Sequence, residues 1–188
     1  MPIDFVLHAG ELLVLEGRNG AGKTTLLRAL LGLHPLQAAQ LSLREVDVLQ
    51  DRHPLCAAAN WLGHLLALKG DLSVAENVAV GLAIAGEPVP ADLETLCADV
   101  GLAGYEHTPA RALSAGQRKR AALARLAASQ RPIWLLDEPF ANLDGAGMAL
   151  VEALLGAHLA RGGGAMLTSH GVLPIHLPAT TLRLEHPR

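Results

Sequence analysis

Apolar residues in this chain fall into short runs that alternate with longer stretches in which they recur at helical spacing. The short runs predict strands, at residues 3–7, 11–16, 41–48, 60–65, 132–137, 164–169 and 180–185. The helical spacing predicts helices, at residues 23–33, 73–85, 90–100, 114–129 and 145–161. Ser73 and Glu76 stand at the spacing of a capping box at the start of one helix. Because strands alternate with helices, the pattern predicts an α/β fold with a largely parallel sheet.

The order of the elements also predicts the domain organisation. The chain has 188 residues, enough for one domain with its own core. The segment from about residue 73 to residue 129 is nearly all helical and lies between two predicted strands. We therefore expect a single domain, residues 1–188, in which a helical subdomain is inserted into a parallel-sheet core.

Composition and charge exclude several classes of protein. The net charge of −3 shows no basic excess, so nucleic acid is not an expected partner. No apolar run approaches the ~18 residues that a membrane span needs, and residues 1–4 lack the features of a signal peptide. Cys56 and Cys97 lie far apart, which favours buried reduced thiols. We expect a cytoplasmic chain that docks on a membrane protein if it meets a membrane at all.

A glycine-rich segment between a predicted strand and a predicted helix carries the clearest chemistry. Residues 17–24 read GRNGAGKT and match G-x-x-x-x-G-K-[ST], the phosphate loop of nucleotide-binding proteins. Its glycines allow the backbone N–H groups to approach phosphates, Lys23 supplies a positive charge, and the Thr24 hydroxyl can ligate Mg²⁺. The N-terminus of the following helix adds its dipole. The predicted nucleotide-binding residues are Gly17, Arg18, Asn19, Gly20, Ala21, Gly22, Lys23, Thr24 and Thr25.

Two carboxylates follow the apolar strand at residues 132–137. In an open α/β sheet, ligands bind at the carboxyl ends of the strands. Asp137 is therefore predicted to hold Mg²⁺ opposite Thr24, and Glu138 to accept a proton from the water that attacks the γ-phosphate. Taken alone, the same pair could be solvated acids after a strand.

Several separate stretches together resemble the ATPase subunits of ABC transporters. Residues 113–117 (LSAGQ) resemble the signature motif of that family, usually LSGGQ. Residues 137–140 (DEPF) and 142–144 (NLD) resemble its second nucleotide motif and D-loop, and residues 168–170 (TSH) resemble its switch-histidine motif. The motifs occur in the family's order, from the phosphate loop almost to the C-terminus. The resemblance implies a P-loop NTPase of the ABC ATPase type.

The resemblance also implies roles for these residues. Two chains would form an ATP-dependent homodimer around two ATP molecules, in which Ser114, Gly116, Gln117 and Asp144 contact nucleotide. His170 would hydrogen-bond the γ-phosphate and hold the attacking water. Integral membrane transporter subunits would be the further partners, with ATP and Mg²⁺ as cofactors, at the cytoplasmic face of the inner membrane. From its position alone, Ser114 is just as easily a helix N-cap.

Within the family, some details resemble the ATPase subunit of the haem exporter used in cytochrome c maturation. These are Ala115 in the signature, the segment 61–64 (WLGH) with Lys69, Glu76 and Asn77, and the segment 151–163 before the last motif. The resembled task is the coupling of ATP binding and hydrolysis to conformational change in membrane subunits. An ATPase of another ABC transporter remains a second interpretation.

Two departures from the family pattern favour a third interpretation, a nucleotide-binding regulatory module that no longer hydrolyses ATP. The position of the family's Q-loop glutamine is matched by Leu65, which has no ligating atom; His64 is a candidate substitute. The start of the chain is also short compared with the family's usual N-terminal strands and adenine-stacking aromatic residue, so that either the true start lies upstream or the adenine base is bound weakly. Phe5 is predicted to be a core residue. Lys23, Asp137, Glu138 and His170 are all intact, which favours the enzyme.

Overall fold

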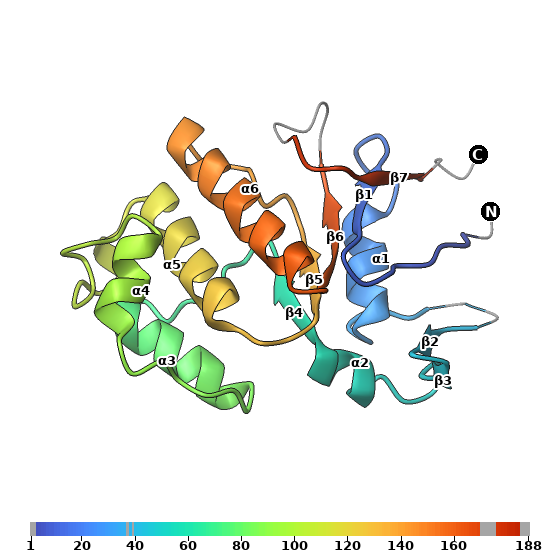
Figure 1. The fold of residues 1–188 in the computed structure, drawn as a ribbon, viewed down its shortest axis with the longest axis horizontal. Helices are drawn as coiled ribbons and strands as arrows, with labels where there is room; N and C mark the ends of the chain where they lie inside the picture. Colours follow the sequence, from blue (N-terminus) through green and yellow to red (C-terminus); the bar gives the residue numbers. More distant parts are fainter. Residues whose placement is uncertain (1–2, 37, 39, 170–175, 185–188) are drawn as a thin grey trace. The chain divides into compact units, whose positions relative to one another are not determined.

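The computed structural model describes residues 3–36, 38, 40–169 and 176–184. The chain divides into two compact units (Figure 1). The first comprises Met1–Trp61, Arg131–Pro139 and Gly156–Arg188, and the second comprises Leu62–Gln130 and Phe140–Leu155. The helical segment expected at residues 73–129 falls within the second unit, to which residues 140–155 also belong.

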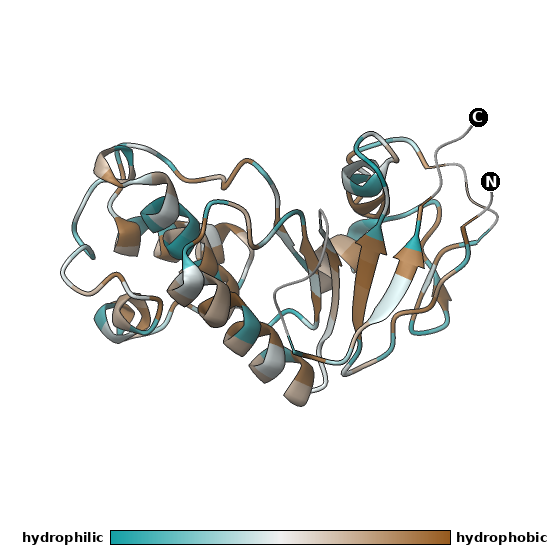
Figure 2. Cartoon of the chain, turned by 90° about the horizontal axis from the view of Figure 1, so that it is seen from above, coloured by the Kyte–Doolittle hydropathy of each residue, from teal (hydrophilic) through white to brown (hydrophobic). Residues whose placement is uncertain are grey.

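A mainly parallel sheet confirms the predicted fold class. Its strands are β1 (Leu12–Glu16), β4 (Ala59–Leu62), β5 (Ile133–Leu136), β6 (Gly164–Thr168) and β7 (Thr180–Arg183), in the order β4-β5-β6-β1-β7. The pairings β1–β6, β1–β7 and β5–β6 are parallel. Every residue of β6 is buried, as expected of a strand covered on both faces. In Figure 2 the strands mostly have the brown colour of hydrophobic residues, and one strand is paler.

Among the described residues, the first unit contains two complete helices, the end of a third and a small hairpin besides the sheet. Helix α1 (Lys23–Leu30) packs Leu27 and Leu30 into a core that includes Leu135 of β5 and Met166 of β6. Helix α2 (His53–Ala58) was not predicted, because its six residues are too few to show a helical period.

Two predicted strands of the first unit differ from the structure. The run 41–48 forms a hairpin of β2 (Ser42–Leu43) and β3 (Val46–Asp47) instead of one strand. Arg44 and Glu45 form its turn with positive φ angles of 50° and 66°, which a two-residue hairpin of this kind requires. The run 3–7 is not a strand in the structure.

Helices form the second unit. They are α3 (Val74–Ile84), α4 (Leu93–Asp99), the short 3-10 helix η1 (Ala110–Ala112), α5 (Ala115–Ala128) and the first part of α6 (Gly145–Ala160). Their core contains Val78, Leu82 and Cys97. Burial raises the pKa of the Cys97 thiol, in agreement with an unreactive core cysteine. Among the described residues, no helix is both long and apolar enough to cross a membrane.

The predicted capping box at the start of α3 is confirmed. The Ser73 hydroxyl accepts a hydrogen bond from the Glu76 backbone N–H (3.2 Å), and the Glu76 carboxylate accepts one from the Ser73 N–H (2.8 Å). Asn77 in the next position bonds the carbonyls of Lys69, Leu72 and Ser73 through its amide. These bonds fix the loop that leads into α3 and satisfy backbone groups that the helix start leaves unpaired.

A histidine and a tryptophan stack inside the first unit. The rings of Trp134 on β5 and His158 in the last turn of α6 lie 4.0 Å apart and are nearly parallel. A His158 ring nitrogen lies 3.2 Å from the Gly164 carbonyl oxygen, and a side chain at Gly163 would overlap the ring. Burial lowers the pKa of His158, and the bond to Gly164 opposes this shift more weakly.

Replacing His158 by Gln is expected to reduce the loss of stability in mild acid. Because the pKa of His158 is lower in the folded chain, the unfolded chain binds the proton more readily. The stability that depends on neutral His158 is present above the ordinary histidine pKa of about 6.5 and is lost as the pH falls from there through the lowered pKa. Thermal unfolding measured between about pH 7.5 and about pH 5 should show a smaller fall in Tm for H158Q than for the wild type. The exposed-site control H53Q should follow the wild type; equal falls in all three proteins would contradict the prediction.

Candidate nucleotide-binding site

The predicted phosphate loop connects β1, which ends at Glu16, to α1, which begins at Lys23. Gly20 and Gly22 have φ angles of 82° and 94°, a region that side chains other than glycine rarely adopt, although a Cβ would meet no atom within 4 Å at either position. A Cβ at Gly17 would lie 2.7 Å from the Leu184 carbonyl oxygen. The backbone conformation therefore requires glycine at residues 20 and 22, and the lack of space for a side chain requires it at residue 17.

Lys23 places a buried positive charge at this loop. The residue is 6% exposed, and its ammonium group donates hydrogen bonds to the carbonyl oxygens of Gly17 (2.6 Å) and Arg18 (3.3 Å). The first turn of α1 contains no acidic residue, and Gly22 at its N-cap has no side chain to accept from the first N–H groups. The ammonium and the helix N-terminus thus both favour an anion at the loop.

Thr24 and Asp137 meet although 113 positions separate them in the chain. Thr24 follows the loop on α1, and Asp137 directly follows β5. The Thr24 hydroxyl donates to Asp137 Oδ1 at 2.8 Å, and the Asp137 residue is only 4% exposed. The structure therefore brings together the two side chains that the sequence predicted as Mg²⁺ ligands.

Glu138 follows Asp137 in an uncommon backbone conformation. Its φ angle is +50°, which is rare for a residue with a Cβ. Its backbone N–H donates to the hydroxyl of Thr168 at 2.9 Å, and that hydroxyl donates to Asp137 Oδ1 at 2.8 Å. Thr168 was not predicted as a site residue, although it is the first residue of the 168–170 segment that resembles the switch-histidine motif. His170 itself lies outside the described residues.

The signature residues lie in the second unit, at the N-terminus of α5. The Ser114 hydroxyl accepts from the Gln117 backbone N–H (3.2 Å), and the Gln117 side-chain oxygen accepts from the Ser114 N–H (2.9 Å). This is a capping box, so the N-cap interpretation of Ser114 is confirmed. A Cβ at Gly116 would be in ordinary contact, at 3.6 Å, with the Asn142 carbonyl oxygen.

Asp144 lies in the same unit, at the N-terminus of α6. Its Oδ1 accepts from the Gly147 N–H at 2.7 Å and lies 3.1 Å from Nη2 of Arg120. The Gly147 N–H, and to a smaller extent the positive charge of Arg120, lower the pKa of the Asp144 carboxyl group. The Asp144 carboxylate therefore caps the N-terminus of α6 and links α6 to α5 through Arg120.

Leu65 stands where the Q-loop glutamine was expected, three residues beyond Leu62, the last residue of β4. The predicted strand 60–65 ends early, at Leu62, and Leu65 is 79% exposed. An exposed leucine offers no oxygen or nitrogen to a ligand. The structure thus gives no physical role in nucleotide binding to this position.

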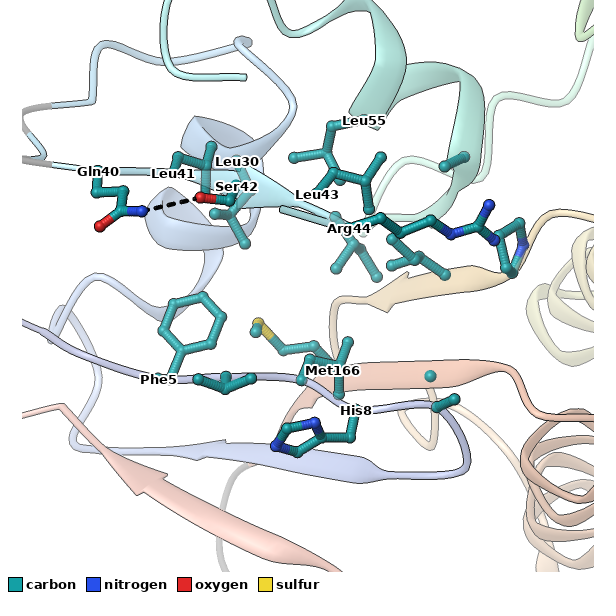
Figure 3. Close-up of a pocket in the computed structure, with 18 of the residues that line it drawn as sticks. Phe5, His8, Leu30, Gln40, Leu41, Ser42, Leu43, Arg44, Leu55 and Met166 are labelled. Atoms are coloured by element: carbon teal, nitrogen blue, oxygen red, sulfur yellow. Dashed lines mark hydrogen bonds between the residues drawn. The ribbon is translucent and has the colours of Figure 1, made fainter. Parts of the chain in front are cut away.

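A pocket of about 890 Å³ in the first unit is separate from these residues (Figure 3). It lies between the N-terminal segment and the hairpin strand β2, and Phe5, Leu30, Leu43 and Met166 are among its labelled lining residues. Phe5 packs against the sheet core, in agreement with its prediction as a core residue. The lining contains none of the residues from 17 to 24 and neither Asp137 nor Glu138, so the pocket is not the predicted phosphate site.

Known proteins resemble this chain in both sequence and structure. Residues 1–141 match the family model described as ABC transporter. The cytochrome c biogenesis ATP-binding export protein CcmA of Xanthomonas axonopodis pv. citri is 48% identical over 171 residues, which cover 90% of this chain and 78% of that protein. The CcmA protein of Methylococcus capsulatus is 43% identical over 184 residues, 97% of this chain and 89% of the relative.

Solved structures agree on the fold. An ABC transporter ATP-binding protein of Pyrococcus furiosus superposes with a TM-score of 0.81 at 19% identity, covering 95% of this chain and 86% of its own. An ATP-binding subunit of another ABC transporter gives 0.79 at 22% identity, over 90% and 72% of the two chains. The order of motifs, the parallel sheet and the family match agree: this chain belongs to the ABC transporter family, as one of its ATP-binding ATPase subunits.

Proposed function

We propose that this chain hydrolyses ATP at the phosphate loop with Mg²⁺ held by Thr24 and Asp137. The observation that carries this proposal is the 2.8 Å contact between the Thr24 hydroxyl and Asp137 Oδ1, beside a loop with a buried lysine. A hydroxyl and a carboxylate are the hard oxygen donors that Mg²⁺ prefers, and it usually binds to few protein groups together with substrate phosphates. Among the described residues, no group of three or more His, Cys, Asp or Glu side chains is placed to hold a metal ion. When bound, the ion would neutralise charge on the phosphates.

The residues of the chain have separate tasks in this proposal. The loop N–H groups and Lys23 bind and orient the β- and γ-phosphates, which reduces the charge that repels an attacking water. Glu138 accepts the proton of that water as its oxygen attacks the γ-phosphorus and the bond to the bridging oxygen of ADP breaks. His170 is proposed to hydrogen-bond the γ-phosphate and keep the water in line.

A second copy of the chain is proposed to complete the site. The N-terminus of α5, with Ser114, Gly116 and Gln117, is a helix start whose dipole favours an anion. In a homodimer, this end of one protomer would face the γ-phosphate bound by its partner, and Asp144 would lie near the same interface. The capping box is compatible with this role because it leaves other N–H groups of the first turn for a ligand.

We further propose that the chain drives the haem exporter of cytochrome c maturation. The support is the 43–48% identity to CcmA proteins, which are export proteins by name. The chain would bind peripherally to integral membrane subunits at the cytoplasmic face of the inner membrane, and its conformational change would be transmitted to them. Nucleic acid has no role in this proposal, in keeping with the net charge of −3. The exposed Leu65 favours the alternative of a regulatory module that binds nucleotide without hydrolysing it.

Deleting the gene from its source organism is expected to abolish covalent haem attachment to c-type cytochromes. The reason is that a transporter without its ATPase cannot complete its cycle. Haem staining of membrane proteins on denaturing gels measures the loss. The wild-type gene should restore the stained bands, the E138Q gene should not, and the tagged wild-type chain should co-purify with integral membrane proteins from detergent-solubilised membranes. Normal cytochromes in the deletion strain would contradict the haem-exporter proposal but not the ATPase.

A further inference from the structure

Thr168 is a buried polar residue at the carboxyl end of β6. The residue is 1% exposed. Strand β6 pairs in parallel with β5, and Leu136 is opposite Leu167 in the register. The next residues are Asp137, directly after β5, and Thr168, the last residue of β6, so the hydroxyl of Thr168 lies beside the two acids that follow β5. A buried hydroxyl requires hydrogen-bond partners, and these acids supply both of them.

One hydroxyl group contacts both acidic residues in different ways. Thr168 Oγ1 donates to Asp137 Oδ1 at 2.8 Å and accepts from the Glu138 backbone N–H at 2.9 Å. A threonine hydroxyl has a single donor, so the donated proton fixes the direction of the O–H bond and leaves the lone pairs for the Glu138 N–H. The Thr24 hydroxyl also donates to this Oδ1 atom. Two hydroxyls from distant parts of the sequence therefore hold one carboxylate oxygen. These bonds restrict rotation of the Asp137 carboxylate.

The second bond acts on a strained part of the backbone. Glu138 has a φ angle of +50°, a conformation that costs free energy for a residue with a Cβ and persists only where its surroundings hold it. The bond from the Glu138 N–H to Thr168 is a contact that holds this peptide in place. The direction in which the Glu138 side chain leaves the backbone depends on that peptide, so the position of the carboxylate depends on Thr168.

We infer that Thr168 is a positioning residue for ATP hydrolysis, which orients the Asp137 carboxylate toward the metal and the Glu138 side chain toward the attacking water. The inference rests on the function proposed for Asp137 and Glu138. Thr168 acts only through these two residues: it takes no proton from the substrate and forms no bond to it. A hydroxyl at this position is therefore required, and the methyl group of threonine is not.

The substitution T168V removes the hydroxyl and keeps the shape of the side chain. It is expected to lower kcat about 10- to 100-fold, because two hydrogen bonds that hold catalytic groups are lost, while KM for ATP changes less than about threefold. The Mg²⁺ concentration for half-maximal turnover should rise several-fold. T168S retains the hydroxyl and should keep kcat within about threefold of the wild type. T181V, on the exposed strand β7 of the same unit, is the matched control and should leave kcat and the Mg²⁺ dependence unchanged.

Steady-state phosphate release and thermal unfolding should be measured together for these variants and for E138Q. Wild-type kcat and Mg²⁺ dependence in T168V, or equal losses in T168V and T168S, would overturn the inference. If E138Q is inactive while T168V is normal, only the inference about Thr168 fails; if E138Q is as active as the wild type, the proposed function itself fails. If T168V does not fold, T168A should be used in its place, because the smaller side chain fits the same space. Its kcat and Mg²⁺ dependence are then compared with those of T168S, and the same outcomes would overturn the inference.

Discussion

The E138Q variant should hydrolyse ATP about 100- to 1,000-fold more slowly than the wild type while it still binds ATP. A general base contributes about this much to proton transfer, and a glutamine amide cannot accept the proton. Glutamine has nearly the shape of glutamate, and its backbone N–H can keep the bond to Thr168 that the structure shows for Glu138. Phosphate release under saturating ATP measures turnover, and a fluorescent ATP analogue measures binding.

The same variant should accumulate as an ATP-bound dimer in size-exclusion chromatography with Mg²⁺ and ATP. If two chains enclose the nucleotide, blocked hydrolysis removes the step that separates them. E94Q, which changes an exposed glutamate of α4 in the second unit, is the matched control and should behave as the wild type. If E138Q changed neither turnover nor dimerisation, the chain would not be an enzyme that uses Glu138, and the non-hydrolysing regulatory module would be the better interpretation.

The K23A variant should lose ATP affinity by about 30-fold or more. Removing one partner of a buried, charge-assisted contact to a bound anion costs on the order of 2–5 kcal/mol, which corresponds to this change in Kd. Lys23 is buried and bonds two loop carbonyls, so its ammonium group lies at the loop and cannot be replaced by a neighbouring surface lysine. Isothermal titration calorimetry with ATP measures the affinity.

K69A provides the control, because Lys69 is an exposed lysine outside the phosphate loop. Its Kd for ATP should equal that of the wild type. Circular dichroism and Tm should show that K23A is folded, since the Gly17 and Arg18 carbonyls lose a donor in this variant. Tight ATP binding by folded K23A would contradict the assignment of residues 17–24 as the phosphate loop.

Local sequence patterns predicted most of the fold correctly. They were wrong at segments whose structure depends on long-range contacts. Helices α3, α5 and α6 lie within one residue of their predicted ends at both termini, because their capping residues and apolar period act within a few positions. The prediction of one strand at residues 41–48 was wrong. The hairpin sets the positive φ angles of Arg44 and Glu45, and these are not residue types that usually form such turns. The run 3–7 has a strand-like composition, but strand formation requires a partner strand in register.

The residues of the candidate site also fall into some that local patterns could predict and others that depend on long-range contacts. Every residue of the candidate phosphate loop could be proposed from the sequence, since a contiguous segment of backbone forms such a loop and its glycines are a local requirement. Asp137 and Glu138 could be named from their place after an apolar strand. Thr168 belongs to the segment that resembles the switch-histidine motif, but its hydrogen bonds to Asp137 and Glu138 could not be predicted, because they depend on long-range contacts.

By itself, the sequence determined the fold class and predicted the phosphate loop and the acidic residues of the candidate site, because short-range constraints on backbone conformation, helix capping and strand burial are visible in neighbouring positions. Only the tertiary structure decided that Thr24, Asp137, Glu138 and Thr168 form one hydrogen-bonded group. These residues come from α1, β5 and β6, and the hydrogen bonds that connect them depend on the parallel register of β5 and β6 and on the packing of α1 against the sheet. Hydrogen bonds across such distances in the chain follow from the folded backbone, so no local pattern of residue types can specify them.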